Sequence, residues 1–319
     1  MRPRGRRAAA IALRGLCGAA AVAYVAHHLS WGAVWGTLRH ARTDLLAAVV
    51  VINAGMLWVR AVRLRVLLQP TRATLPRLFL AVLTSSAINN VLPLRAGDLA
   101  RLFMLENVAR ISKTVATAVA LVEKLLEVVV LAALALAAAC DAPGQAWARG
   151  AGAAGLGLAL ASLCLLNWVT EGPVVRLPAF TRKLAERMAP GTHALRNPRA
   201  LAAALGASLA AWCCELAMIM LCARAIGLAI GPALAVVVLL GINLAMLLPS
   251  LPANAGAFEG AAAVVLVLAG VPKPAAVAFA VLYHLVQIVP VTVAGLALLA
   301  RNGMTLRSFE TRAEPTSAG

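Results

Sequence analysis

Charged and aromatic residues are scarce in this sequence of 319 residues: 13% are Asp, Glu, Lys or Arg, and 4% are Phe, Trp or Tyr. Hydrophobic residues make up 62% of the chain, and its mean hydropathy is +0.88. A soluble domain of this composition would expose much of its apolar surface to water. The composition therefore excludes a soluble globular protein and predicts an all-α, polytopic helical membrane protein.

Motifs for catalysis and cofactor binding are also absent. The six cysteines have no metal-binding or redox spacing. No P-loop, dinucleotide fingerprint or nucleophile elbow occurs. We therefore expect no cofactor, no metal and no enzyme activity, and we interpret the cysteines as small apolar packing residues.

Acidic residues are few, with 12 Asp and Glu against 29 Lys and Arg, so the net charge is +17. Such an excess is found in nucleic-acid-binding proteins, but here the basic residues occur in short tracts beside apolar runs. This pattern indicates membrane topology and attraction to anionic lipids, with no nucleic-acid partner. The positive-inside rule places both termini of this multi-pass chain in the cytoplasm.

Two apolar runs are too short to cross a bilayer. Residues 78–92 would form roughly 22 Å of helix, against a hydrocarbon core of about 30 Å. Pro93 ends this run, and Pro249 ends the second run at 232–248. We expect both to turn back as re-entrant hairpins, at about 78–110 and 232–270. Full spans are expected at 8–29, 44–66, 114–139, 150–169, 200–223 and 275–299, with a basic amphipathic helix at 180–188.

The two halves of the chain resemble each other. Each is expected to contain two spans, a broken hairpin and a further span, and the hairpins open from opposite sides of the membrane. Inverted repeats with broken helices are typical of alternating-access transporters. We therefore divide the chain into halves at 1–149 and 150–304 and a polar cytoplasmic tail at 305–319. A chance similarity between two breaks is the alternative. The matching residues are Ile88-Asn89, Pro93 and Ala96-Gly97-Asp98 in the first half and Ile242-Asn243, Pro249, Ala255-Gly256 and Glu259 in the second.

Charged residues at membrane depth mark the candidate site. Glu123 and Glu127 are four residues apart and share a helix face, and Lys124 can reach Glu127. Two such carboxylates need a cation in a low-dielectric setting, and Arg95 or Arg101 is the expected partner. A free arginine there would suit a phosphate group. A structural salt-bridge cluster is the alternative. The candidate headgroup-binding residues are Arg95, Asp98, Arg101, Glu123, Lys124, Glu127, Asn243, Glu259 and His284.

Other charged and polar residues receive a simpler interpretation. Arg60, Arg63 and Arg65 are expected at the cytoplasmic end of the span at 44–66. Glu259 stands at the second break, with Asn243 on the run entering it. His284 and Gln287 share one face of the last span, where a lone histidine is more often a packing residue than a proton relay. Glu215 lies on the span at 200–223.

The segment from Asn89 to Arg101 contains the pattern N-x-L-P-x-R-x-G-D-x-x-R. It is followed by Glu123-Lys124-Leu125-Leu126-Glu127 and later by Pro249-x-x-Pro252-x-x-x-Gly256-x-x-Glu259. Together these motifs resemble the flippase-like transmembrane family, that of the membrane portion of lysylphosphatidylglycerol synthetases of the MprF type. The resemblance covers about residues 10–300. Two residues depart from it, because the family usually has Glu in place of Asp98 and Arg in place of Lys124.

The resemblance implies a stand-alone member without the synthetase domain, of the kind that moves lipids between leaflets. The expected function is therefore that of a lipid translocase for a phospholipid, a hopanoid or a polyprenyl-linked lipid. Expected partners are membrane lipids with an anionic headgroup, with a second copy of the chain or a lipid synthase as further candidates. Two alternatives are an integral membrane transferase that acts on a lipid-linked donor and a non-transporting accessory of a lipid-modifying enzyme.

Overall fold

The computed structural model describes residues 31–69, 73–92, 96–141, 146–171, 179–247 and 252–301, and these ranges contain helices and no strand. This confirms the all-α prediction. The span predicted at 8–29 and the tail at 305–319 lie outside the described residues. The long helices are α3 (Thr43–Leu67), α6 (Lys113–Asp141), α7 (Ala146–Glu171), α9 (Pro198–Ala225) and α12 (Lys273–Arg301); the shorter elements are α2 (Trp31–Leu38), α4 (Leu75–Val91), α5 (Ala96–Ala109), α8 (Ala179–Thr192), η2 (His193–Leu195), α10 (Pro232–Ala245), η3 (Pro252–Asn254) and α11 (Ala257–Leu268).

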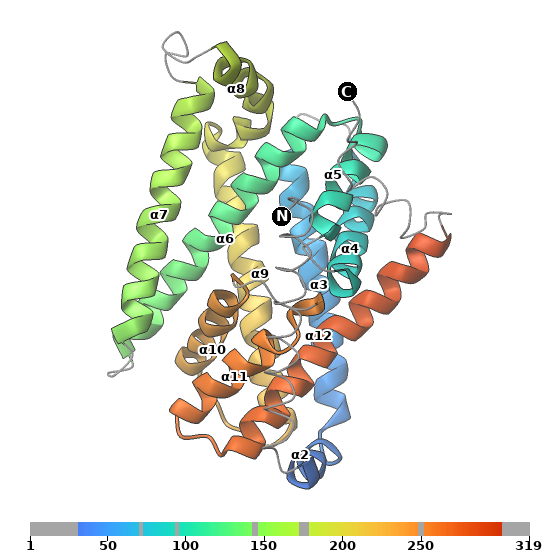
Figure 1. The fold of residues 1–319 in the computed structure, drawn as a ribbon, viewed down its shortest axis with the longest axis vertical. Coiled ribbons are helices and arrows are strands. Elements are labelled where there is room, and N and C mark those ends of the chain that lie inside the picture. The colour runs from blue at the N-terminus through green and yellow to red at the C-terminus, as the bar shows by residue number, and fades with distance from the viewer. Residues whose placement is uncertain are drawn as a thin grey trace, which may run out of the picture.

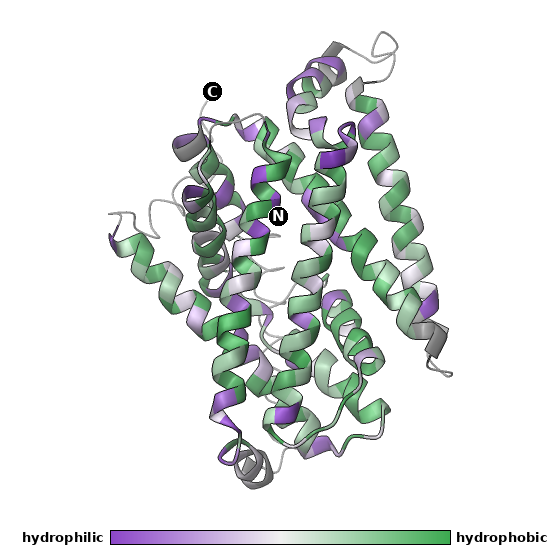
Figure 2. Ribbon diagram, turned by 180° about the vertical axis from the view of Figure 1, so that it is seen from behind, coloured by the Kyte–Doolittle hydropathy of each residue, from purple (hydrophilic) through white to green (hydrophobic). Residues whose placement is uncertain are grey.

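Four of these helices are long and apolar enough to cross a membrane: α3, α7, α9 and α12. They match the spans predicted at 44–66, 150–169, 200–223 and 275–299, and their ribbons are mostly hydrophobic in Figure 2. Helix α6 has 29 residues and corresponds to the span predicted at 114–139, but charged residues interrupt its first half. The protein is therefore a multi-pass membrane protein.

The two predicted breaks separate two pairs of short helices. Helices α4 and α5 contain 17 and 14 residues, and α10 and α11 contain 14 and 12. At 1.5 Å per residue, even α4 extends only about 26 Å, short of a hydrocarbon core of about 30 Å. Leu92, which precedes Pro93, has the extended conformation typical of a residue before proline (φ −99°, ψ 141°).

Helices α3 and α9 pack along each other through the centre of the molecule. In Figure 1 the α4–α5 pair lies in the upper half of the view, and the α10–α11 pair lies in the lower half. Helix α12 packs against both α4 and α11, and η3, in the second break, also contacts α4. Residues from the two breaks are thus brought to the same region of the bundle.

Helix α8 confirms the predicted amphipathic helix. Its side chains Arg182, Lys183 and Arg187 are exposed, whereas Ala185 is buried. The helix packs against α6 and α7 at one end of the molecule (Figure 1). Its exposed basic residues form a hydrophilic surface beside the ends of two long apolar helices.

Glycines allow α4 to be approached closely from two sides. A Cβ atom on Gly97 would overlap the backbone oxygen of Ser85, so α5 can pack here only with glycine. A Cβ atom on Gly295 of α12 would overlap the Cβ atom of Ala87 and press on the Leu83 carbonyl. Helix α4 is therefore held between α5 and α12 at distances that larger residues would not permit.

Replacing Gly295 with Ala should push α12 away from α4 and destabilise the fold by about 1–3 kcal/mol, a typical cost of overpacking. The measurement is thermal unfolding of the purified protein in detergent. Gly206→Ala on α9 is the matched control, because a Cβ atom there meets nothing within 4 Å. Equal melting temperatures for the two variants would show that the α4–α12 contact is not tight.

Candidate functional site

A pair of buried carboxylates on α6 forms the centre of the site. Glu123 and Glu127 lie four residues apart on one helix face, and their side chains are 2% and 17% exposed. Two carboxylates this close together in a low-dielectric interior repel each other unless cations neutralise them. The cations come from three helices, α3, α5 and α6 itself.

Arg63 of α3 binds both carboxylates. Its Nη2 atom lies 2.5 Å from Oε1 of Glu127 and 3.5 Å from Oε1 of Glu123. Its Nη1 atom donates a hydrogen bond to Oγ of Ser208 on α9 at 3.1 Å. The Arg63 side chain is only 3% exposed, so this residue connects α3, α6 and α9 inside the bundle.

Arg63 lies within two turns of the end of α3, as predicted, but it is buried and was not expected to belong to the site. One signal could have identified it. Arg60 and Arg63 are three residues apart on one helix face, and this face meets buried carboxylates, with Arg63 at Glu123 and Glu127 and Arg60 at Glu215.

Arg101 and Lys124 complete the neutralisation. Arg101 of α5 forms an ion pair with Glu123 through its Nη2 atom. The Lys124 Nζ atom lies 2.9 Å from Oε2 of Glu127. Both pairings confirm what the sequence predicted. With Arg63 included, Glu123 and Glu127 are each paired with two cations.

A polar cavity of about 110 Å³ lies beside this cluster. Five of the predicted site residues line it, and Arg95 lies outside the described residues. Arg60, Arg63 and polar residues of α4 also line it and were missed as site residues. The lining comprises Arg60, Arg63, Val82, Ser85, Ser86, Asn89, Asp98, Arg101, Glu123, Lys124 and Glu127.

Asn89 joins the two sides of the first break. Its Oδ1 atom accepts a hydrogen bond from the backbone N–H of Gly97 at 2.8 Å, and its Nδ2 atom donates to Oδ1 of Asp98 at 3.1 Å. The first turn of a helix has backbone donors without helical partners, and this amide satisfies one of them. Asn89 thus positions Asp98 at the edge of the cavity.

Two nitrogen atoms of the site have no partner among the described residues. The Nε atoms of Arg60 and Arg63 are buried and make no hydrogen bond there. A buried donor without an acceptor is costly.

Arg60 extends the network toward α12. Its Nη2 atom lies 3.3 Å from Oε1 of Glu215 on α9. The other oxygen of Glu215 accepts hydrogen bonds from the Tyr283 hydroxyl at 2.7 Å and from Nε2 of Gln287 at 2.8 Å. The polar network therefore runs from α6 through α3 and α9 to α12.

The structure places the three predicted residues of the second half outside the cavity lining. His284 and Glu259 pair with each other, with 2.7 Å between Nδ1 and Oε1. Asn243 donates to the carbonyl of Leu239, one turn earlier on α10, at 2.9 Å. Among the described residues, Glu259 does not contact the arginines of the first half.

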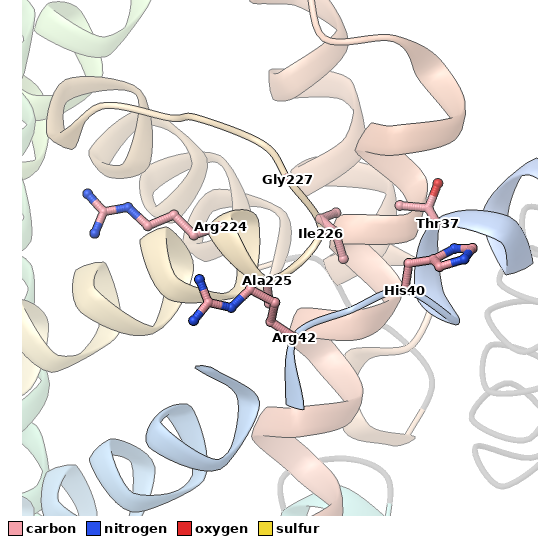
Figure 3. Close-up of a pocket in the computed structure, with 7 residues that line it drawn as sticks. All are labelled: Thr37, His40, Arg42, Arg224, Ala225, Ile226 and Gly227. Carbon is pink, nitrogen blue, oxygen red and sulfur yellow. The ribbon is translucent and has the colours of Figure 1, made fainter. Parts of the chain in front are cut away.

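A larger, open depression of about 440 Å³ lies between the α2–α3 connection and the end of α9 (Figure 3). Arg42 and Arg224 line it together with Thr37 and His40, and both arginines extend away from His40 in Figure 3. Arg42 is already paired with Asp44 at 2.6 Å, and both side chains are more than 60% exposed. This depression lacks the buried, converging charges of the first site.

The described residues contain no group of three or more His, Cys, Asp or Glu side chains placed to hold a metal ion. Residues 8–295 match the model of a family described as the lysylphosphatidylglycerol synthase TM region. No curated protein and no solved structure matches the chain. The family match covers both helical breaks and every residue of the charged network.

Replacing Arg63 with Met should leave Glu123 and Glu127 short of a cation and destabilise the fold by about 3–5 kcal/mol, the usual cost of breaking a buried ion pair. Thermal unfolding in detergent measures the effect. Arg182→Ala is the control, because Arg182 and Glu186 form an exposed pair at 3.8 Å, and such pairs contribute about 0–1 kcal/mol. A loss of stability no greater than that of the control would argue against the buried network.

Proposed function

This chain belongs to the family of the lysylphosphatidylglycerol synthase TM region, and we propose that it moves a lipid between the two leaflets of a bacterial inner membrane. The headgroup would pass through the polar cavity beside α6, while its acyl or isoprenoid tail stays in the surrounding lipid. One observation supports this function most directly. Cations and carboxylates converge around a cavity inside a bundle of apolar helices.

The charges of the cavity suit an anionic headgroup. Arg60, Arg101 and Lys124 line the cavity with side chains that are 31%, 16% and 59% exposed, whereas Arg63 is only 3% exposed. A phosphate could replace Glu123 as the partner of Arg101, because Glu123 would remain paired with Arg63. The guanidinium group can bind two phosphate oxygens at once. The carboxylates would neutralise these cations when no lipid is bound.

The helical breaks support movement across the membrane. Short helices that end at membrane depth leave backbone groups unpaired, and these are tolerated where protein or a water-filled cavity supplies partners. We propose that α4–α5 and α10–α11 are re-entrant hairpins of two inverted repeats, with both termini in the cytoplasm. The contact of η3 with α4 is consistent with two hairpin tips that meet near the midplane.

Transport accounts for the cavity better than group transfer does. A general base needs an available lone pair and a pKa near the working pH. Glu123 and Glu127 are each paired with two cations, which occupy the carboxylate oxygens that a base would use. We therefore propose that the chain is not an enzyme and that these residues hold and release a headgroup.

Lipid movement can be measured in proteoliposomes that contain fluorescent phosphatidylglycerol, with a membrane-impermeant quencher added outside. Arg101→Ala should slow the movement about tenfold or more, since a charge-assisted hydrogen bond contributes about 1.5–3 kcal/mol. Arg101→Lys should retain part of the rate, because it keeps the charge but loses the bidentate geometry.

Arg182→Ala, on the exposed face of α8, serves as the matched control and should move lipid at the wild-type rate. All variants are first compared by thermal unfolding, so that a loss of folding is not mistaken for a loss of transport. A folded Arg101→Ala protein that moves lipid as fast as the wild type would contradict the proposed site.

A further inference from the structure

Among the residues that the structure describes, the His284 ring on α12 has two hydrogen-bond acceptors beside it and no donor. Its Nδ1 atom lies 2.7 Å from Oε1 of Glu259, and its Nε2 atom lies 3.0 Å from the carbonyl oxygen of Ala253. A carboxylate and a carbonyl can only accept. Neutral imidazole carries one N–H group and could satisfy one of them, whereas imidazolium donates from both nitrogens. With Glu259 ionised, the geometry therefore fits the doubly protonated ring.

Neighbouring groups offset part of the cost of burying a charged ring. His284 is 4% exposed, and the ring of Phe258 stacks on it with centroids 4.3 Å apart and planes 13° apart. A cation over an aromatic face is stabilised electrostatically. The Glu259 side chain is 27% exposed, so the carboxylate that neutralises the ring is not enclosed by protein.

This pair holds the second helical break in place. The break places Ala253, Asn254 and Gly256 in left-handed backbone conformations, with φ values of 56°, 58° and 84°. Alanine rarely adopts such an angle without external support, whereas asparagine and glycine do so more readily. His284 binds the Ala253 carbonyl, and Oε2 of Glu259 accepts the Gly256 N–H at 2.7 Å. The two side chains thus fix the break from both sides.

No other ionisable group of the described elements pairs with this ring. The only ionisable side chain on helix α11 is Glu259, and the only one on α4 is Arg77 in its first turn. Elements α2, α10 and η3 carry no ionisable side chain. Helix α9 carries Glu215, which is bound to Arg60, Tyr283 and Gln287. On α3, Arg60 and Arg63 are paired with the other carboxylates.

We propose that His284 and Glu259 form a proton-binding site that controls closure of the second helical break. With the proton bound, the imidazolium holds both the Ala253 carbonyl and the Glu259 carboxylate, and the break is closed against α4. Loss of the proton to solvent removes one of the two ring hydrogen bonds and releases one side of the break. The site is occupied at low pH and emptied as the pH rises. This site would exist whether or not the protein moves lipids.

Nitrogen-15 NMR of the full chain, labelled only at histidine and held in detergent micelles, detects the proton directly. The chain contains five histidines. At pH 8 an ordinary imidazole is neutral, so we expect one doubly protonated ring, absent from His284→Gln and neutral in Glu259→Gln. Tyr283→Phe is the matched control, because it removes a neighbouring hydrogen bond to Glu215 and should keep the signal. A neutral His284 ring at pH 8 would overturn the proton site.

Hydrogen exchange of the same protein measures closure of the break. After correction for intrinsic rates, amides of residues 253–258 should exchange about tenfold faster in His284→Gln than in the wild type, as expected for a local opening. Tyr283→Phe should exchange like the wild type there. If the ring is charged but His284→Gln leaves this exchange unchanged, the proton does not control the break. Neither measurement involves lipid movement, so failure here is separate from failure of the translocase function.

Discussion

The need to neutralise two carboxylates on one face of α6 governs the arrangement of the bundle. Glu123 and Glu127 cannot both remain charged in an apolar interior without cations. Arg63 and Arg101 supply these cations, and they bring α3 and α5 against α6. Helix α9 joins through Ser208, which binds Arg63, and through Trp212, whose Nε1 atom donates to the Glu127 carbonyl at 3.0 Å. Four helices thus meet at one charged centre.

The helical breaks impose a second requirement, because each leaves backbone groups without helical partners. Both breaks meet it in a similar way, with a side chain that accepts the N–H of a glycine at the start of the next helix. Asn89 accepts from Gly97 in the first break, and Glu259 accepts from Gly256 in the second. The second break adds His284 from α12, so its closure depends on a group that can gain or lose a proton.

The charged cluster at α6 and the second helical break have different roles in the proposed function. The first gathers charges around a cavity and is suited to bind an anionic group. The second fixes the backbone of a break whose η3 segment contacts α4, the helix that also lines the cavity. A structural change at the second break would therefore be transmitted to the cavity through α4. Helix α12, with Tyr283 and Gln287 bound to Glu215, connects the same two regions through polar contacts.

The amino-acid sequence by itself determined the helices, their breaks and part of the charged site. Hydropathy and proline positions act locally, so α3, α4, α9 and α12 begin and end within a few residues of prediction. The Lys124–Glu127 pair was predictable for the same reason, since helical spacing brings the two residues together. The pairing of Arg101 with Glu123 followed from the need of a buried carboxylate for a cation.

Only the tertiary structure decided which distant residues meet. Arg63 resembles a surface charge in the sequence, and it is buried because α9 and α6 pack around it. Glu259 and His284 were expected beside the arginines of the first half, but the packing of α11 on α12 brings them to each other. A local pattern specifies which face of a helix is polar, whereas the partner of that face depends on how all the helices pack together.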